Sequence, residues 1–324
     1  MKAVFINGTA CISPQPIFEG KEFLQQISAP QNHRLVCAEP DYSAFFEAKN
    51  LRRMGRLLKF GTAAGLLALR RAGIEKPDAI NTGTGLGLLE DSGRFLKSVI
   101  DAHEDTVSPT AFIQSTHNTV SSNISVITGC HAHNFTFSQK GLSFETALLD
   151  SILLLDENEG MQNILTGAYD ELTDYSFAIM QRLGVFRHTE AAGEGAAYFL
   201  LGKTRTETTS AVLYGMETIH DPQNESEVEL QLQHFLKEHQ IETVDLVIDG
   251  SAVPFVSLEN IPSVPFKKYC GEFMTASAFG LWLGVQILSQ QHIPEVLHVS
   301  AKKLDRILIL NQYKKDHSFM LIGR

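Results

Sequence analysis

The most distinctive run of this chain reads Gly193-Glu194-Gly195-Ala196-Ala197-Tyr198-Phe199-Leu200-Leu201. From residue 196 onward it is apolar without interruption, a pattern that is typical of a strand covered on both of its faces. Such strands occur in α/β proteins, in which helices pack on either side of a sheet. We therefore expect residues 196–201 to form a core strand of an α/β protein.

Strand-like and helix-like segments alternate on both sides of this run. The expected strands are 2–12, 78–83, 134–138 and 163–167 before it, and 211–216, 244–250, 306–310 and 319–322 after it. The expected helices are 50–72, with Gly73 at its C-terminal cap, 118–128, 142–155, 225–238 and 275–289. This alternation indicates a mainly parallel sheet. Because the polar stretch 203–210 separates the two series, we expect an N-terminal half of residues 1–210 and a shorter C-terminal half of residues 211–324.

The composition narrows the class of protein. The 324 residues are 44% apolar and 20% charged, as in a soluble globular protein, and their formal net charge of −10 argues against a nucleic-acid partner. A local basic patch at 51–59 is either the solvated start of a helix or a docking site for an acidic partner. No apolar run reaches the roughly 18 residues of a membrane span, and no signal peptide is evident. We therefore expect a cytoplasmic protein without a membrane span.

Cofactor and metal motifs are missing from the sequence. The four cysteines, Cys11, Cys37, Cys130 and Cys270, lack the paired spacing of a zinc site or a disulfide framework. The glycine-rich segment 83–87 lacks the full spacing of a dinucleotide-binding loop, so it indicates close backbone packing instead. Phosphate-loop, zinc-protease and serine-hydrolase motifs do not occur either. We therefore expect neither a cofactor nor a metal.

Several segments together resemble a β-ketoacyl-acyl-carrier-protein synthase of the thiolase superfamily, in the same order over most of the chain. Residues 193–197 match the GEGAA motif of that family, and 167–171 are similar to its GG-x-[DE] strand end. Further landmarks are the arginine-bearing helix at 51–73, Ser108-Pro109, Asn118, Gly129 and Asn134, the strand at 244–248, and Lys267 to Gly271 followed by 276–280. The resemblance implies a thiolase-like α/β fold, in which two similar halves form a layered α-β-α-β-α core.

The same resemblance places the catalytic positions of the family. A condensing ketosynthase uses a cysteine thiolate to accept the acyl chain and two histidines to stabilise the enolate. In this sequence the cysteine position falls at Gly141 and the histidine positions fall at Asp249 and Glu272, whereas Lys267 is retained. Glycine has no nucleophile, and carboxylates would repel a developing enolate. The resemblance therefore implies a member of the family that does not catalyse condensation.

Non-catalytic ketosynthase-like chains pair with active ones as chain-length factors in type II polyketide and aryl-polyene pathways. The resemblance thus implies a heterodimer with an active ketosynthase, which brings an acyl carrier protein to the complex. It also implies candidates for the acyl tunnel, which are Leu86, Leu89, Phe95 and Phe112. Candidates for the dimer interface are Asn134, Phe135, Thr136, Phe137 and Ser138.

Other functions remain open at this stage. The chain could be an active thiolase-fold acyltransferase or β-ketoacyl synthase with a displaced nucleophile, for which Ser138, Ser143, Cys130 and Cys270 are the candidates. His117, His131 and His133 are potential acid-base groups, although packing and surface roles explain them equally simply. A self-associating scaffold or ligand-binding homodimer is a third possibility. The sequence does not decide between a homodimer and a heterodimer, nor does it identify the acyl chain.

Overall fold

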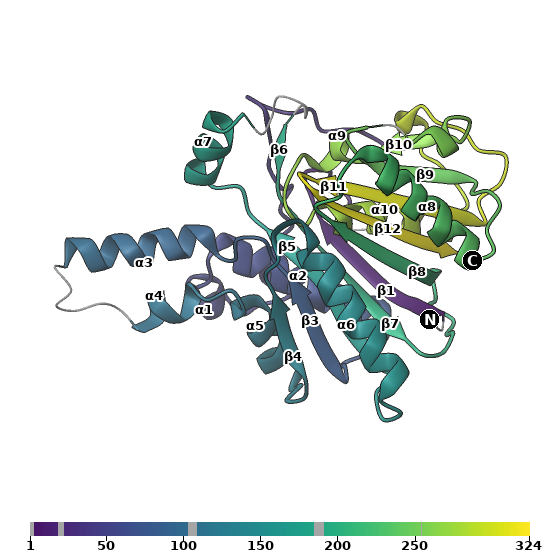
Figure 1. The fold of residues 1–324 in the computed structure, drawn as a ribbon. Coiled ribbons are helices and arrows are strands. Elements are labelled where there is room, and N and C mark those ends of the chain that lie inside the picture. The colour runs from purple at the N-terminus through teal and green to yellow at the C-terminus, as the bar shows by residue number, and fades with distance from the viewer. Residues whose placement is uncertain (1–2, 19–22, 103–108, 185–190, 254) are drawn as a thin grey trace.

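The computed structural model of the protein describes residues 3–18, 23–102, 109–184, 191–253 and 255–324 (Figure 1). Within these residues one sheet of ten strands has the order β10-β9-β11-β12-β8-β1-β7-β5-β3-β4, and β2 (Arg34–Leu35) pairs with β6 (Ala192–Gly193). The other strands are β1 (Val4–Ile12), β3 (Ala79–Gly83), β4 (Asn134–Phe137), β5 (Asn163–Asp170), β7 (Gly195–Gly202), β8 (Ala211–His220), β9 (Leu246–Gly250), β10 (Ser263–Pro265), β11 (Arg306–Tyr313) and β12 (Asp316–Gly323).

Ten α-helices accompany the strands in the described part of the chain. They are α1 (Ala48–Leu51), α2 (Arg56–Arg71), α3 (Leu89–Asp101), α4 (Pro109–Gln114), α5 (Thr119–Thr128), α6 (Ser143–Glu157), α7 (Asp174–Arg182), α8 (Glu225–Glu238), α9 (Lys267–Cys270) and α10 (Ala276–Gln290). No helix in the described ranges combines the length and apolar character needed to cross a membrane.

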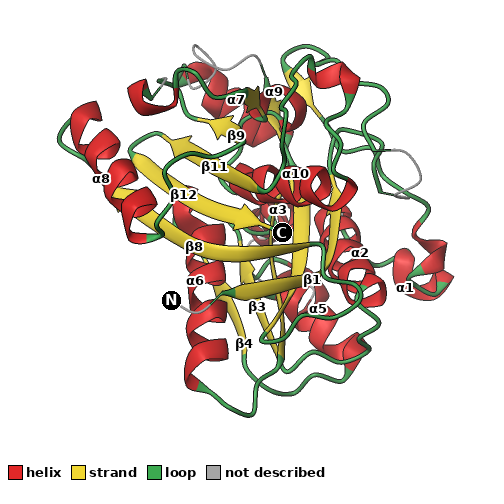
Figure 2. Cartoon of the chain, turned by 90° about the vertical axis from the view of Figure 1, so that its right-hand side faces the viewer, coloured by secondary structure: helices red, strands yellow, loops and turns green. Residues whose placement is uncertain are grey.

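The elements form the layered α-β-α-β-α arrangement that the family resemblance implies. Helix α2 packs on β1, β5 and β7, and α8 covers the opposite outer face, over β9, β11 and β12. Helices α6 and α10 lie between the strands of the two halves, and Figure 2 shows the strands of the second half with α8 beside them. Along β7, Tyr198 and Leu200 face the cluster under α2, whereas Phe199 and Leu201 face the central cluster. The apolar run at 196–201 is therefore a strand that is covered on both faces, as expected.

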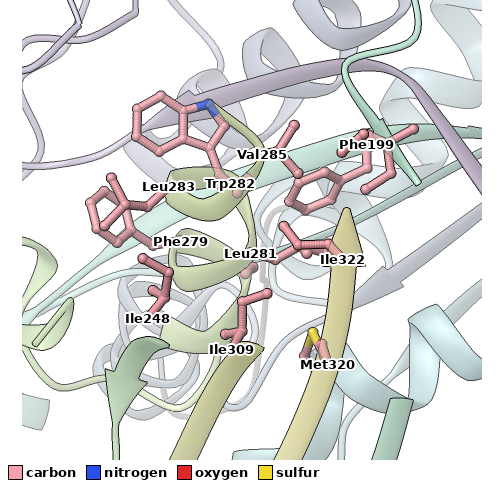
Figure 3. Close-up of a cluster of buried hydrophobic side chains, with 14 of the residues drawn as sticks. Phe199, Ile248, Phe279, Leu281, Trp282, Leu283, Val285, Ile309, Met320 and Ile322 are labelled. Atoms are coloured by element: carbon pink, nitrogen blue, oxygen red, sulfur yellow. The ribbon is translucent and has the colours of Figure 1, made fainter. Parts of the chain in front are cut away.

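Helix α10 carries apolar residues on all of its sides, and it is accordingly buried on all sides. Figure 3 shows its side chains packed between Ile248, Ile309 and Ile322 of the second half and Phe199 of the first. Close packing of backbone is part of this contact, since a Cβ atom at Gly284 would lie 3.0 Å from the Ile322 side chain. The centre of the molecule is thus built from both halves.

The prediction of a mainly parallel sheet is wrong. Four of the nine ladders described in the large sheet are parallel, and five are antiparallel. A parallel pair needs a crossover connection, usually a helix, whereas a short connection permits an antiparallel pair. Strands β11 and β12 are joined by a short turn and pair antiparallel, and β1 pairs antiparallel with both of its neighbours, β7 and β8.

Most expected elements are present, with two kinds of difference. The expected helix at 50–72 is split into α1 and α2, because the chain is extended at Gly55, where the backbone packs against the Asp91 side chain. Gly73 has a φ of +69°, so the helix ends in the left-handed conformation that favours glycine. Helices α3, α4 and α7 were not expected. The landmark Ser108 lies outside the described residues, and the division at 203–210, which falls between β7 and β8, stays a prediction.

Candidate functional site

A cleft of about 890 Å³ opens where the end of β9, helix α9 and the turn after β11 meet. Asp249, Lys267 and Glu272 all line this cleft, although they come from separate segments of the second half. They meet because β9 runs parallel to both β10 and β11, so the carboxyl ends of the three strands lie at one edge of the sheet. The structure therefore brings together three of the four positions that the sequence places at the family's active site.

Lys267 and Glu272 form an ion pair inside the cleft. The ammonium nitrogen of Lys267 lies 2.9 Å from Glu272 Oε2 and also donates to the backbone carbonyl of Gln312. Burial raises the pKa of Glu272, and the charge of Lys267 opposes this shift. The other carboxylate oxygen of Glu272 is buried without a hydrogen-bond partner among the described residues. Lys267, which the resemblance implies is retained, is thus paired with the carboxylate at a position where the resemblance implies a histidine.

Asp249 is held by the loop that follows it. Its Oδ1 accepts hydrogen bonds from the backbone N–H of Ser251, at 2.8 Å, and from the Ser251 hydroxyl. Burial raises the pKa of Asp249, while these hydrogen bonds and the charge of Lys267 oppose the shift. When it is ionised, the Asp249 carboxylate can only accept hydrogen bonds, so in that state it cannot donate one to a developing enolate oxygen.

Gly141 lies in the turn between β4 and α6, and it has no room for a side chain. A Cβ atom built on Gly141 would lie 2.7 Å from the Cβ of Tyr313 and 2.9 Å from Asp316 Oδ2. Tyr313 also lines the cleft, so its side chain occupies the space between the cleft and Gly141. That Tyr313 fills the space beside Gly141 was not predicted from the sequence.

The alternative nucleophiles have other roles in the structure. The Ser143 hydroxyl accepts from the backbone N–H of Gln139 and donates to the backbone carbonyl of Lys140, each at 2.8 Å, so it stabilises the turn before α6. Ser138 makes a long contact of 3.5 Å with the Gly85 carbonyl. Cys130 and Cys270 are fully buried, and burial raises the pKa of Cys270 well above its usual value. A buried thiol with a raised pKa is a poor nucleophile.

The three candidate histidines lie outside the cleft. His133 is 3.1 Å from an Asp150 oxygen and contacts the Phe135 ring in a tilted arrangement, with centroids 4.1 Å apart. The ring of His117 packs against Gly87, and its backbone carbonyl accepts a hydrogen bond from Tyr169. His131 is exposed. These contacts fit packing and surface roles.

The four tunnel candidates lie on and beside α3. Leu86 is in the loop after β3, Leu89 starts α3, and Phe95 packs against Phe112 of α4 with ring centroids 5.5 Å apart. None of the four lines the 890 Å³ cleft. Their part in an acyl tunnel stays a prediction.

The interface candidates occupy the edge of the sheet. Strand β4 pairs with β3 on one side, and no other described strand pairs with its second edge. Phe135 points to solvent, whereas the Thr136 hydroxyl bonds inward to the hydroxyls of Thr82 and Ser121, at 2.9 Å each. An open strand edge can pair with another chain, so β4 is available for the interface that the resemblance implies.

Glu194 and Asp170 are structural residues whose roles the sequence did not indicate. Glu194 of the GEGAA run is fully buried, binds Arg56 through a contact of 2.6 Å, and accepts from two backbone N–H groups. Arg56, whose side chain is 32% exposed, is thus anchored to a buried carboxylate, whereas the role of the rest of the basic stretch 51–59 stays a prediction. Asp170 accepts from Thr84, from two N–H groups of the glycine-rich loop, and from Thr275 of the second half. Asp170 is the last residue of β5 and Glu194 directly precedes β7, so an acidic residue next to an apolar strand was the available signal in the sequence.

Comparison with known proteins agrees with this architecture. The family model described as the N-terminal domain of β-ketoacyl synthases matches residues 38–247. A β-ketoacyl synthase from Burkholderia phymatum STM815 is similar over 100% of both chains, with 15% identity and a TM-score of 0.76. The ishigamide ketosynthase/chain length factor is similar over 99% of both chains, with 16% identity and a TM-score of 0.76.

A third similar structure is a type II PKS acyl-carrier protein in complex with its ketosynthase bound to the hexaketide. That likeness covers 100% of this chain and 99% of the other, with 15% identity and a TM-score of 0.78. A search of curated proteins found no match. At these identities the solved structures establish the fold, while the family model covers well over half of the chain. The protein therefore belongs to the β-ketoacyl synthase family and has its thiolase-like fold.

Proposed function

We propose that this chain is a non-catalytic ketosynthase-like subunit, a chain-length factor that pairs with an active ketosynthase and shapes its acyl tunnel. The pathway class is polyene, polyketide or fatty-acid-like biosynthesis. The observation that carries the proposal is the filled space at Gly141, where Tyr313 and Asp316 lie within 3 Å of a would-be Cβ atom. Neither an acyl acceptor nor room for one exists at that position.

The charged groups in the cleft support the same proposal. Condensation requires donors or positive charge where the enolate oxygen develops. Asp249 and Glu272 are acceptors there when ionised, and Lys267 is already paired with Glu272 at 2.9 Å. This cleft would therefore disfavour the enolate.

The proposed partner binds at the open edge of β4. Pairing of two such edges across a two-fold axis would extend the sheet from one chain into the next, and the exposed Phe135 would be buried there. The likeness to the ishigamide ketosynthase/chain length factor is consistent with a role as the second chain of such a pair.

Acylation tests the loss of catalysis. The purified chain is incubated with an acyl-carrier-protein thioester, or with cerulenin, and its intact mass is measured. We expect no mass increase, while an active ketosynthase treated in parallel gains the acyl group and serves as the control. An adduct that maps to Ser138, Ser143 or a cysteine would instead establish the alternative, an acyltransferase with a displaced nucleophile.

Co-expression tests the partner role. The chain is produced together with a ketosynthase encoded beside it, and the products are separated by size-exclusion chromatography and weighed by native mass spectrometry. We expect a stable complex with one copy of each chain. A stable homodimer that ignores the ketosynthase would contradict the chain-length-factor proposal and favour a self-associating scaffold.

A further inference from the structure

Glu145 is a fully buried acid in the first turn of α6. Its Oε1 accepts a hydrogen bond of 2.7 Å from the Ser318 hydroxyl of β12, and the Ser277 hydroxyl of α10 lies beside the same carboxyl. Helix α6 belongs to the first half of the chain, whereas β12 and α10 belong to the second. The Glu145 carboxyl therefore lies at the junction of the two halves.

Two buried polar atoms at this junction, Glu145 Oε2 and Ser277 Oγ, have no hydrogen-bond partner among the described residues. A buried polar atom without a partner costs free energy, so a bond between these two neighbours would remove both costs at once. A carboxylate only accepts hydrogen bonds, whereas a protonated carboxyl also donates one. Which of the two atoms donates therefore depends on whether the Glu145 carboxyl carries a proton.

The surroundings of Glu145 do not stabilise a negative charge. Glu194 shows the contrast, because it is equally buried but binds Arg56 and two backbone N–H groups. Within the described residues no ion pair joins Glu145 to a basic side chain, and its charged neighbour is another acid, Asp316, which is paired with His220 at 2.6 Å. Burial raises the pKa of Glu145, although the two neighbouring hydroxyls and its own backbone N–H oppose this shift.

We propose that Glu145 is a proton-bearing latch between the two halves: its neutral carboxyl donates from Oε2 to the Ser277 hydroxyl and accepts at Oε1 from the Ser318 hydroxyl. With the proton in place, the carboxyl ties α6 to α10 and β12 without burying a charge.

Loss of the proton releases the latch. The carboxyl then becomes a buried carboxylate beside Asp316, and both the burial and the like charge disfavour that state. Gly141, four residues before Glu145, also packs against Asp316, so the latch holds the turn beside the cleft as well. This inference does not depend on the proposed function.

The variant Glu145→Gln tests whether the proton is present, because its amide can donate to Ser277, accept from Ser318 and carry no charge at any pH. The folded wild type should hold one proton that the unfolded chain releases above the usual pKa of 4.5. Folded wild type thus loses stability as the pH rises, and its unfolding equilibrium constant should increase relative to that of the variant by up to about tenfold per pH unit. Urea unfolding between pH 5 and pH 8 measures this ratio.

The matched control is Glu242→Gln, at an exposed position where the carboxyl is solvated in both states, so the ratio to wild type should stay constant. A constant ratio for Glu145→Gln as well would show that Glu145 is ionised in the folded protein, and the latch would then be refuted.

Infrared spectroscopy identifies the hydrogen-bond partner, and it keeps the proposal testable if Glu145→Gln does not fold. The C=O stretching band of a protonated carboxyl lies apart from that of a carboxylate and moves to higher frequency when the carboxyl loses a hydrogen bond. In the difference spectrum between wild type and Ser277→Ala at pH 7, other buried acids cancel and Glu145 should give one shifted band. A spectrum without any such shift would contradict the proposed bond to Ser277.

Hydrogen exchange tests the consequence for the fold. The backbone amides of residues 141–147 are compared between wild type and Glu145→Gln at the same pH, so the intrinsic pH dependence of exchange cancels. At alkaline pH the wild type should exchange faster there than the variant, whereas the amides of α8, on the outer face of the second half, should exchange equally in both. Equal exchange at residues 141–147 would show that the proton does not act as a latch.

Discussion

Gly141 stands at the position that we propose for the acyl-accepting nucleophile of the family, and its surroundings leave no room for a side chain. Its φ lies outside the left-handed region, so the backbone admits any residue, and the obstacle is the contact with Tyr313 and Asp316. We expect Gly141→Ala to lower the free energy of unfolding by about 1–3 kcal/mol, the usual range for an overpacked site. Gly141→Cys should be destabilised similarly and should not become acylated. Urea unfolding and intact-mass measurement check the two outcomes.

The control for this substitution is Gly93→Ala in α3. A Cβ atom at Gly93 meets nothing within 4 Å, so alanine should stabilise the helix by about 0.5–1 kcal/mol. If alanine lowers the free energy of unfolding at Gly141 and raises it at Gly93, the loss at Gly141 results from its contacts with Tyr313 and Asp316. A neutral or stabilising Gly141→Ala would show that Tyr313 moves aside readily, and the argument for a filled site would then fail.

Glu171 gives the protein a stability that depends on pH. Burial raises the pKa of Glu171 from 4.5 to about 7, although the hydrogen bond from the Glu90 N–H opposes this shift. The folded chain thus binds this proton more tightly than the unfolded chain does. The stabilisation of the fold by the protonated Glu171 is complete below pH 4.5. It is lost as the pH rises through 7, and the loss in the free energy of unfolding is up to about 3 kcal/mol.

The variant Glu171→Gln isolates this contribution, because its amide oxygen can still accept from Glu90. The difference in unfolding free energy between variant and wild type should be small at pH 4.5 and should favour the variant at pH 8. Other buried acids with raised pKa values, such as Asp170 and Glu145, cancel in this difference. A difference that does not change between these two pH values would contradict the assignment to Glu171.

At the scale of elements, the sequence indicated the layers better than the strand directions. Apolar runs and helical spacing predict buried segments, and β7, α8 and α10 lie within a residue of where they were expected. Strand direction depends on which connections contain a helix, so the antiparallel pairs of β1 and β12 were missed. Helix α3 was missed because Ser92, Gly93 and Ser98 are poor helix formers and its exposed apolar row does not mark a core-facing side.

At the candidate site, too, the sequence predicted some features and missed those that depend on tertiary packing. The order of the family motifs implies that Asp249, Lys267 and Glu272 stand at active-site positions of the family. The structure brings all three to one cleft. The residue that fills the space beside Gly141 was not predictable, because Tyr313 reaches it from β11, far away in the sequence. A resemblance can indicate which residues are replaced, but what occupies the vacated space depends on packing between distant segments.

At the scale of the whole molecule, the two halves share one core. Strand β1 pairs with β7 of the first half and, through residues 4–6, with β8 of the second. The central cluster contains residues of α6 and α10 together, and α10 also packs on β7. The division at 203–210 is therefore expected to separate two structural halves that do not fold independently.

Unfolding followed by two probes tests this expectation. Trp282, the only tryptophan, is buried in α10, so its fluorescence reports on the central layer, while far-UV circular dichroism reports on all elements. Urea unfolding should give coincident transitions by both probes. The fragment 211–324 alone should show no cooperative transition, because α10 would expose the face that packs on β7, and co-expression with the fragment 1–210 should restore it. Two separated transitions in the full chain, or a cooperatively folded fragment, would show that each half holds its own core.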